Sequence, residues 1–150
     1  PMWQPLESPK SAQSADPKFE HPLLQRYYEE KLPEIGHLSR ELRELLECIH
    51  QNIFEPGLNV KTVRARCRIR DNNISSRFRR ALGTGIKSYI DSHRMEAARS
   101  LLLESDLPVF DVAMAVGYSH VETFYQVFHR HFDNTPGRFR RRQDGAETEA

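Results

Sequence analysis

Apolar residues recur every three to four positions through most of the chain after residue 37, which is the spacing of one face of an α-helix. The clearest stripe runs from Leu38 to Ile53 and ends at Pro56-Gly57. No segment alternates apolar and polar residues over more than a few positions, so we expect no β-sheet. The pattern predicts an all-α fold of about seven helices. The predicted helices cover 38–54, 60–67, 71–82, 86–104, 109–116, 119–132 and a short segment that begins at Pro136.

The two ends of the chain lack this helical spacing. Residues 1–20 hold four of the nine prolines, together with serine, alanine and glutamine, which is typical of a linker or a disordered segment. Residues 22–32 could add a short helix. We therefore divide the chain into an N-terminal linker with that short helix (1–37), a helical domain (38–142) and an acidic polar tail (143–150).

Charge is distributed unevenly along the chain, although the net charge is only +1. Residues 58–142 carry sixteen basic and eight acidic side chains, a net charge of +8, while the segments on both sides are acidic. A basic block of this size is typical of a protein that binds a polyanion such as nucleic acid. The alternative interpretation is a basic surface that contacts only solvent.

Several classes of protein are disfavoured by the sequence. No stretch approaches the roughly 20 apolar residues of a membrane span, and no secretion signal opens the chain, so we expect a cytoplasmic protein with no membrane partner. Cys48 and Cys67 are too few for a disulfide scaffold and lack the spacing of metal ligands. We expect Cys67 in the core, with redox sensing as the alternative.

The chain also lacks the motifs of catalysis. It has no glycine-rich phosphate loop, no nucleophile elbow and no paired-carboxylate cleft. His129 and His131 are two positions apart, so they point to different faces of a helix and predict no metal site. We therefore expect no enzymatic activity, no metal and no cofactor.

Segments 60–82 and 109–132 resemble each other, because each predicts a short helix, a tight turn and a longer helix. Ala113 and Gly117 suit this arrangement, since a small residue lets two helices cross closely and glycine allows a turn with positive φ. The longer helix of such a unit can enter the major groove of DNA.

Individual residues of both halves add a family signature. The second half contains Val109, Val112-Ala113, Gly117-Tyr118, Phe124, Phe128, Thr135-Pro136 and Phe139-Arg140. The first half and the long helix contain Ile74, Phe78, Gly83, Tyr89, Arg94, Ala98 and Leu101-Leu102. Over residues 38–142 this pattern resembles the AraC/XylS family of transcription regulators. The resemblance implies two helix–turn–helix subdomains joined by a long central helix, with their recognition helices in successive major grooves of double-stranded DNA.

The resemblance also implies a biological role and partners. It implies a sequence-specific transcription regulator of the activator type, which contacts RNA polymerase. The chain shows no sensor domain, so we expect either the DNA-binding end of a longer regulator, with homodimerisation through a region not in this chain, or a small stand-alone regulator. The alternative is a helical protein–protein adaptor that docks through helix 38–54 and binds DNA weakly or not at all.

Some positions depart from the family pattern. Arg64 stands where the family has a small residue, and Arg68 stands where it has the turn glycine. Because a non-glycine residue at positive φ costs about 1 kcal/mol, we expect the first turn to be built differently. Gly85 replaces a capping serine or threonine, Asp133 replaces a glycine but tolerates the left-handed conformation, and His129 replaces a lysine.

In the first motif, the recognition helix is predicted over 71–82. By position in the family pattern, Asn72, Ser75 and Ser76 face the bases, and helical spacing adds Arg79. The alternative is that Asp71 or Asn72 only caps the helix. The neighbouring Arg77 and Arg80 are predicted phosphate contacts, since they share this basic run.

In the second motif, the family pattern assigns base contacts to Val121, Glu122, Thr123 and Gln126. Valine suits a thymine methyl group and glutamine suits adenine. Glu122 has an alternative role, because Ser119 and Glu122 have the spacing of a capping box, which we favour over cytosine recognition. The predicted phosphate contacts here are Tyr125, His129, Arg130 and Arg138.

Overall fold

The computed structural model describes residues 21–30 and 37–149, with side chains up to Arg142. This part of the chain forms eight α-helices and contains no strand, which confirms the predicted all-α fold. The helices are α2 (Pro22–Glu30), α3 (Arg40–Gln51), α4 (Val60–Arg66), α5 (Ile74–Leu82), α6 (Ile86–Glu104), α7 (Val109–Ala115), α8 (Val121–Phe132) and α9 (Pro136–Glu149). The linker predicted for residues 1–20 lies outside the described residues.

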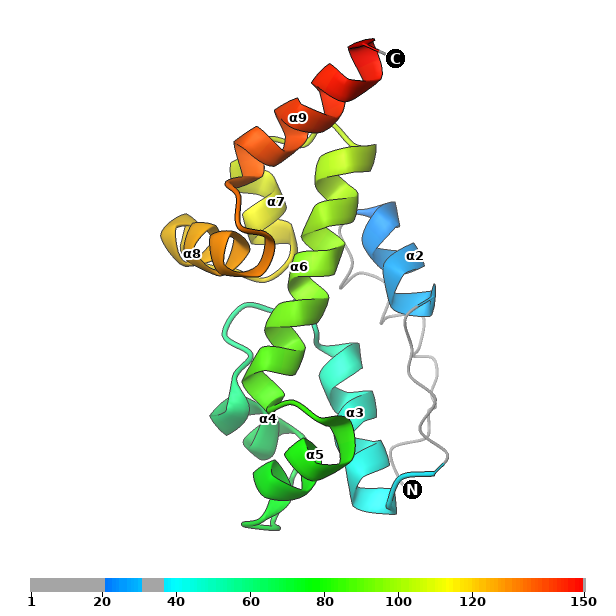
Figure 1. The fold of residues 1–150 in the computed structure, drawn as a ribbon. Helices are drawn as coiled ribbons and strands as arrows, with labels where there is room; N and C mark the ends of the chain where they lie inside the picture. The colour runs from blue at the N-terminus through cyan, green and yellow to red at the C-terminus, as the bar shows by residue number, and fades with distance from the viewer. Residues whose placement is uncertain (1–20, 31–36, 150) are drawn as a thin grey trace.

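The long helix α6 runs through the middle of the molecule, and the other helices pack along it (Figure 1). Helices α3, α4 and α5 gather around its N-terminal end, while α7, α8 and α9 gather around its C-terminal half. Helix α2 lies across α6 from α8. The structure therefore contains two helix–turn–helix units, α4–α5 and α7–α8, joined by a central helix, as predicted.

Buried apolar side chains fix the helices in this arrangement. Phe78 of α5 and both Phe124 and Phe128 of α8 are fully buried. Burial of one such side chain contributes about 1.5–3 kcal/mol relative to exposure. The residues of α6 that are buried are Ile86, Ile90, Arg94, Met95, Ala97, Ala98, Leu101 and Leu102. All but one of these are apolar, so α6 is the shared core element of both units.

The apolar stripe of α3 is buried inside the molecule. Leu42, Leu45, Leu46 and Ile49 are all 5% exposed or less. They lie on a helix that packs against α4 and α5. Docking through this helix, as in the adaptor alternative, would therefore have to use its acidic outer face, which is exposed.

Several helix ends differ from the prediction, and three of them concern the two motifs and the last helix. Helix α5 begins at Ile74, three residues later than expected, and α8 begins at Val121 rather than at residue 119. The last helix is not short, since α9 continues to Glu149 and includes most of the predicted acidic tail. Thr135 caps the start of this helix, because its hydroxyl accepts a hydrogen bond from the Arg138 N–H at 3.3 Å.

Cys48 and Cys67 form a disulfide bond between α3 and the C-terminal end of α4. Their Cα atoms are 6.1 Å apart, within the usual range for a disulfide. Cys67 is half-buried and packs against the core. The prediction of a core position for Cys67 is therefore only partly correct. Its pairing depends on the packing of α3 against α4, which the linear spacing of 19 residues does not reveal.

The turns of the two helix–turn–helix units share one backbone geometry. In the first turn, Arg68 has φ 57°, and the Ile69 N–H donates to the Arg64 carbonyl at 2.9 Å. The second turn has the equivalent hydrogen bond and has Gly117 at φ 106°. The expectation that the first turn is built differently is wrong, because an arginine takes the left-handed conformation. Asp133 does the same after α8, with φ 55°.

Candidate nucleic-acid interface

The outer face of α5 carries most of the predicted first-motif residues. Ile74 and Phe78 turn into the core, while Ser75, Ser76 and Arg79 are exposed on the other side of the helix. Arg80 is also exposed. The structure therefore brings both serines and two basic residues to one polar surface, with hydroxyl and guanidinium groups available to a ligand.

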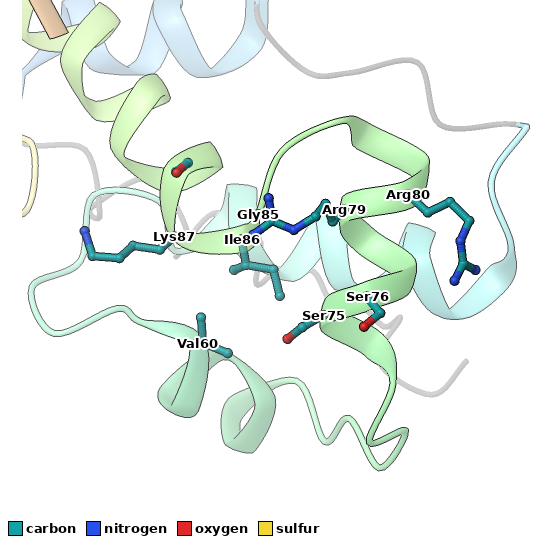
Figure 2. Close-up of a pocket in the computed structure, with 9 residues that line it drawn as sticks. Val60, Ser75, Ser76, Arg79, Arg80, Gly85, Ile86 and Lys87 are labelled. Atoms are coloured by element: carbon teal, nitrogen blue, oxygen red, sulfur yellow. The ribbon is translucent and has the colours of Figure 1, made fainter.

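A groove of about 610 Å³ lies beside this face, between α5, the start of α4 and the start of α6 (Figure 2). Arg79 extends from α5 towards Gly85, where an added Cβ atom would lie 2.9 Å from its Nη2 atom. Glycine at the start of α6 therefore leaves room for the Arg79 side chain. The groove is lined by Val60, Ser75, Ser76, Arg79, Arg80, Gly85, Ile86, Lys87 and Ser88.

Lys87 and Ser88 are exposed residues of this groove that the sequence analysis missed. They lie on the first turn of α6 and come close to α5 only in the folded chain. The Lys87 ammonium pairs with the Asp91 carboxylate at 2.8 Å, and the Lys87 side chain is 72% exposed. The sequence signal that could have found them was the glycine before α6, which marks an open helix N-terminus with free N–H groups.

Asn72 does not lie on the recognition helix, because it precedes Asn73, the N-cap residue of α5. Its side-chain oxygen accepts a hydrogen bond from Arg64 Nη2 at 3.4 Å, and the Asp71 carbonyl accepts one from Arg64 Nη1 at 2.9 Å. Arg64 thus holds the turn that leads into α5. The cap interpretation of Asn72 is wrong, since the N-cap residue is Asn73 and it makes no side-chain cap hydrogen bond.

Arg77 is directed towards α3 rather than into the groove. Its guanidinium pairs with the carboxylates of Glu41, at 2.6 Å, and of Asp71, and it donates to the Ser39 hydroxyl at 3.0 Å. The hydrogen bonds to Glu41 and Asp71 raise the pKa of Arg77 above its ordinary value. The pKa of Asp71 is lowered by the backbone N–H of Asn73 and then by Arg77. Arg77 therefore stabilises the motif internally.

The outer face of α8 carries the predicted second-motif residues. Phe124, Val127 and Phe128 are buried beneath it. Val121 is half-buried and packs against the core. The exposed residues of α8 and of the adjoining α9 that belong to the predicted set are Glu122, Thr123, Tyr125, Gln126, His129, Arg130 and Arg138.

The capping box predicted at the start of α8 is absent. The N-cap residue is His120, which makes no side-chain cap hydrogen bond, so Ser119 lies outside the helix end. Glu122 remains in the first turn of α8 and is exposed, where its charge complements the positive end of the helix dipole. The preference for a capping role over base contact is therefore wrong for Glu122.

Several arginines of the basic block bind other parts of the same chain. Arg66 pairs with Glu55, Arg94 is buried, and Arg140 donates to the carbonyls of Leu102 and Leu107 at 2.9 and 2.7 Å. The charge available to a polyanion is therefore smaller than the count of the block suggests. Within the described residues no group of histidine, cysteine or acidic side chains could hold a metal ion, and no helix could span a membrane.

Two short helices that each lead, through a left-handed turn, into a helix with a polar outer face define a protein of the double helix–turn–helix class. A family model described as a helix-turn-helix domain matches residues 63–142, more than half of the chain. The chain belongs to the AraC-type helix–turn–helix family of DNA-binding transcription regulators.

Individual relatives agree with this assignment. The chain is 33% identical over 101 residues to the regulatory protein SoxS of Salmonella typhimurium, which covers 67% of this chain and 94% of SoxS. It is 32% identical over 84 residues to the xylose operon regulatory protein of Escherichia coli, which covers 56% of this chain and only 21% of that longer protein. Among solved structures, the C-terminal domain of AraT, a response regulator from Geobacillus stearothermophilus, has a TM-score of 0.66 at 25% identity and covers 71% of this chain and 88% of that domain.

Proposed function

We propose that this chain binds specific sequences in double-stranded DNA by inserting α5 and α8 into two successive major grooves. The observation that carries the proposal is the pair of equivalent polar helix faces, each backed by buried aromatic residues and each following the same turn. An α-helix fits the major groove, which is about 12 Å wide. A face of hydroxyl, amide and guanidinium groups can bond to base edges there.

The proposed base contacts follow from the exposed faces. On the first motif they are Ser75, Ser76 and Arg79 of α5, with Asn72 approaching from the preceding turn. On the second motif they are Val121, Glu122, Thr123 and Gln126. Arginine suits guanine, glutamine and asparagine suit adenine, and valine suits the thymine methyl group.

The proposed phosphate contacts are Arg80, Tyr125, His129, Arg130 and Arg138, all of which are exposed. We leave out Arg77 because two carboxylates already neutralise its charge. Lys87 joins the set, since it lines the groove beside α5 and its side chain is 72% exposed. These contacts would position the protein on DNA without selecting a sequence.

The wider role is proposed from the resemblance to the family rather than from the geometry. The chain covers 94% of SoxS but only 21% of the xylose operon regulatory protein. The role of the whole protein is therefore part of this proposal. We propose an activator that contacts RNA polymerase in the cytoplasm, without enzymatic activity. Any homodimer would form through a region outside this chain.

A salt titration of DNA binding tests the proposal. A site is first selected from random double-stranded DNA, and its affinity is then measured by mobility shift at increasing salt. If about 6–8 phosphates are neutralised, log K should fall against log[salt] with a slope of roughly −5 to −7. A slope shallower than about −2, or equal affinity for selected and random DNA, would contradict binding through both motifs.

A further inference from the structure

Arg94 is the one charged residue among the buried residues of α6. It lies near the middle of this helix and is only 4% exposed. A buried guanidinium must be compensated by hydrogen-bond acceptors, because its transfer out of water is costly. The partners that Arg94 uses belong to both halves of the molecule, and none of the predicted DNA contacts is among them.

Towards the first motif, Arg94 binds the loop between α3 and α4. Its Nε atom donates to the Ile53 carbonyl at 2.8 Å, and its Nη2 atom donates to the Glu55 carbonyl at 2.7 Å. This loop leads directly into α4, the first helix of the first helix–turn–helix unit. Arg94 therefore fixes the loop that positions α4.

Towards the second motif, Arg94 binds the turn between α7 and α8. Its Nη1 atom donates to the Gly117 carbonyl at 3.2 Å, and its guanidinium lies 5.1 Å from the centre of the Tyr118 ring. An added Cβ atom on Gly117 would lie 2.7 Å from the Arg94 Cζ atom. Glycine is therefore required at this turn both for its φ of 106° and for space beside the guanidinium.

We propose that Arg94 is a positioning residue that fixes the spacing between the two recognition helices, by tying the loop before α4 to the turn before α8. Long helices curve gently, so α6 alone would not hold the loop before α4 and the turn before α8 at one fixed separation. The arginine fork is planar and rigid, and its donors act on three separate carbonyls at once. The proposal rests on the proposed binding of DNA by both motifs.

The chain offers a matched control in Arg140. This side chain also donates to several backbone carbonyls, among them those of Leu102 and Leu107. These partners lie at the end of α6 and just before α7, so Arg140 holds the second half together without bridging to the first. Loss of Arg140 should affect stability but not the spacing between the motifs.

The test uses binding sites in which one or two base pairs are inserted between the two half-sites. Each base pair moves the second half-site by about 3.4 Å and turns it around the DNA axis. We expect the native protein to lose at least about tenfold in affinity on these sites, since the displaced half-site no longer meets its recognition helix. Arg94→Met and Arg94→Lys should bind the native spacing more weakly and lose less than about threefold on insertion. Arg140→Lys should keep the native preference.

A second measurement needs no DNA. Spin labels on Ala81 of α5 and Asp111 of α7, both exposed, report the distance between the motifs. The distance distribution should be narrow in the native protein and in Arg140→Lys, and broad in both Arg94 variants.

The outcomes separate the two proposals. A native protein without any spacing preference would contradict binding by both motifs, and the label distances would still decide the role of Arg94. Unchanged spacing preference and unchanged label distances in the Arg94 variants would overturn the positioning role. Failure of both variants to unfold cooperatively would also overturn it, because Arg94 would then be a requirement for folding.

Discussion

At the scale of single residues, Arg68 has the least favourable backbone conformation of the first motif. It is exposed and has φ 57°, whereas the equivalent position of the second motif is glycine. An L-residue in this conformation costs roughly 1–2 kcal/mol relative to a right-handed one. We therefore expect Arg68→Gly to raise the free energy of unfolding by about 1 kcal/mol in chemical denaturation. Arg70→Gly is the control, because Arg70 has no positive φ and should lose stability instead.

A second prediction at this scale separates specificity from affinity. Gln126→Ala should cost about 1–3 kcal/mol on the best DNA site only, because the amide loses its bonds to one base. Arg130→Ala should weaken binding to all sequences alike and reduce the salt slope by about 1. Both side chains are exposed on α8, with Arg130 nearer its end. If Gln126→Ala lost equal affinity for specific and for random DNA, this face of α8 would not recognise bases.

At the scale of helices, the contact of α3 with α6 contains a buried histidine. His50 is 3% exposed, and its Nε2 atom lies 2.7 Å from the Tyr89 hydroxyl, with the rings of His93 and Tyr28 beside it. Burial, followed by the neighbouring His93, lowers the pKa of His50 from 6.5 to about 4. The folded protein therefore resists the proton that the unfolded chain accepts.

This shift predicts a dependence of stability on pH. Because the folded-state pKa is the lower one, the contribution is complete above about pH 6.5 and is lost as the pH falls towards about 4. The free energy of unfolding should decrease by up to about 3 kcal/mol across this window. Urea titrations at a series of pH values measure it, and His50→Gln should flatten the profile between these limits. If the free energy of unfolding of His50→Gln fell as steeply with pH as that of the native protein, other groups would cause the pH dependence.

The disulfide between α3 and α4 gives another prediction at this scale. It closes a segment of 19 residues, and in the chain-entropy account a loop of that size contributes about 3 kcal/mol. Reduction with dithiothreitol should lower the free energy of unfolding by about this amount. The double variant Cys48→Ser, Cys67→Ser should show the same loss and no response to the reductant. If the free energy of unfolding of the native protein did not change with the reductant, the disulfide would not contribute to stability.

The accuracy of the sequence predictions follows from which interactions define each helix. Helix α6 matches its predicted range of 86–104, because its own stripe of apolar residues defines it. Helix α5 begins later than predicted because Arg64, from the preceding helix, holds Asp71 in a turn. The pairing of Cys48 with Cys67 likewise depends on contact between helices. Local spacing predicts helices, but it does not reveal bonds that form only after packing.

At the scale of the whole molecule, the same distinction applies to the candidate interface. The outer faces of α5 and α8 could be predicted, because buried Phe78 and Phe124 identify the opposite face by helical spacing alone. The partners of individual charged side chains could not be predicted. Arg77 binds Glu41, which lies 36 positions earlier, and Arg94 binds backbone carbonyls of both motifs. The groove residues Lys87 and Ser88 could not be predicted either, because they lie beside α5 only in the folded chain.

The size of the DNA site is the prediction that belongs to the whole molecule. Recognition helices in successive grooves on one face of DNA must lie about 34 Å apart. Helix α6 has 19 residues and, at about 1.5 Å per residue, a length of about 28 Å, with one helix–turn–helix unit beside its N-terminal end and the other beside its C-terminal half. One chain should therefore protect about 20 base pairs in a footprinting experiment.

Variants of each motif test that prediction directly. Replacing Ser76 and Arg79 by alanine should shorten the protected region from one side, and replacing Thr123 and Gln126 should shorten it from the other. Each pair lies on one exposed recognition face only, so each removes the base contacts of one motif. Protection of only about 10 base pairs by the native chain would show that a single motif engages DNA. In that case the polar face of the other motif would have a role other than DNA binding.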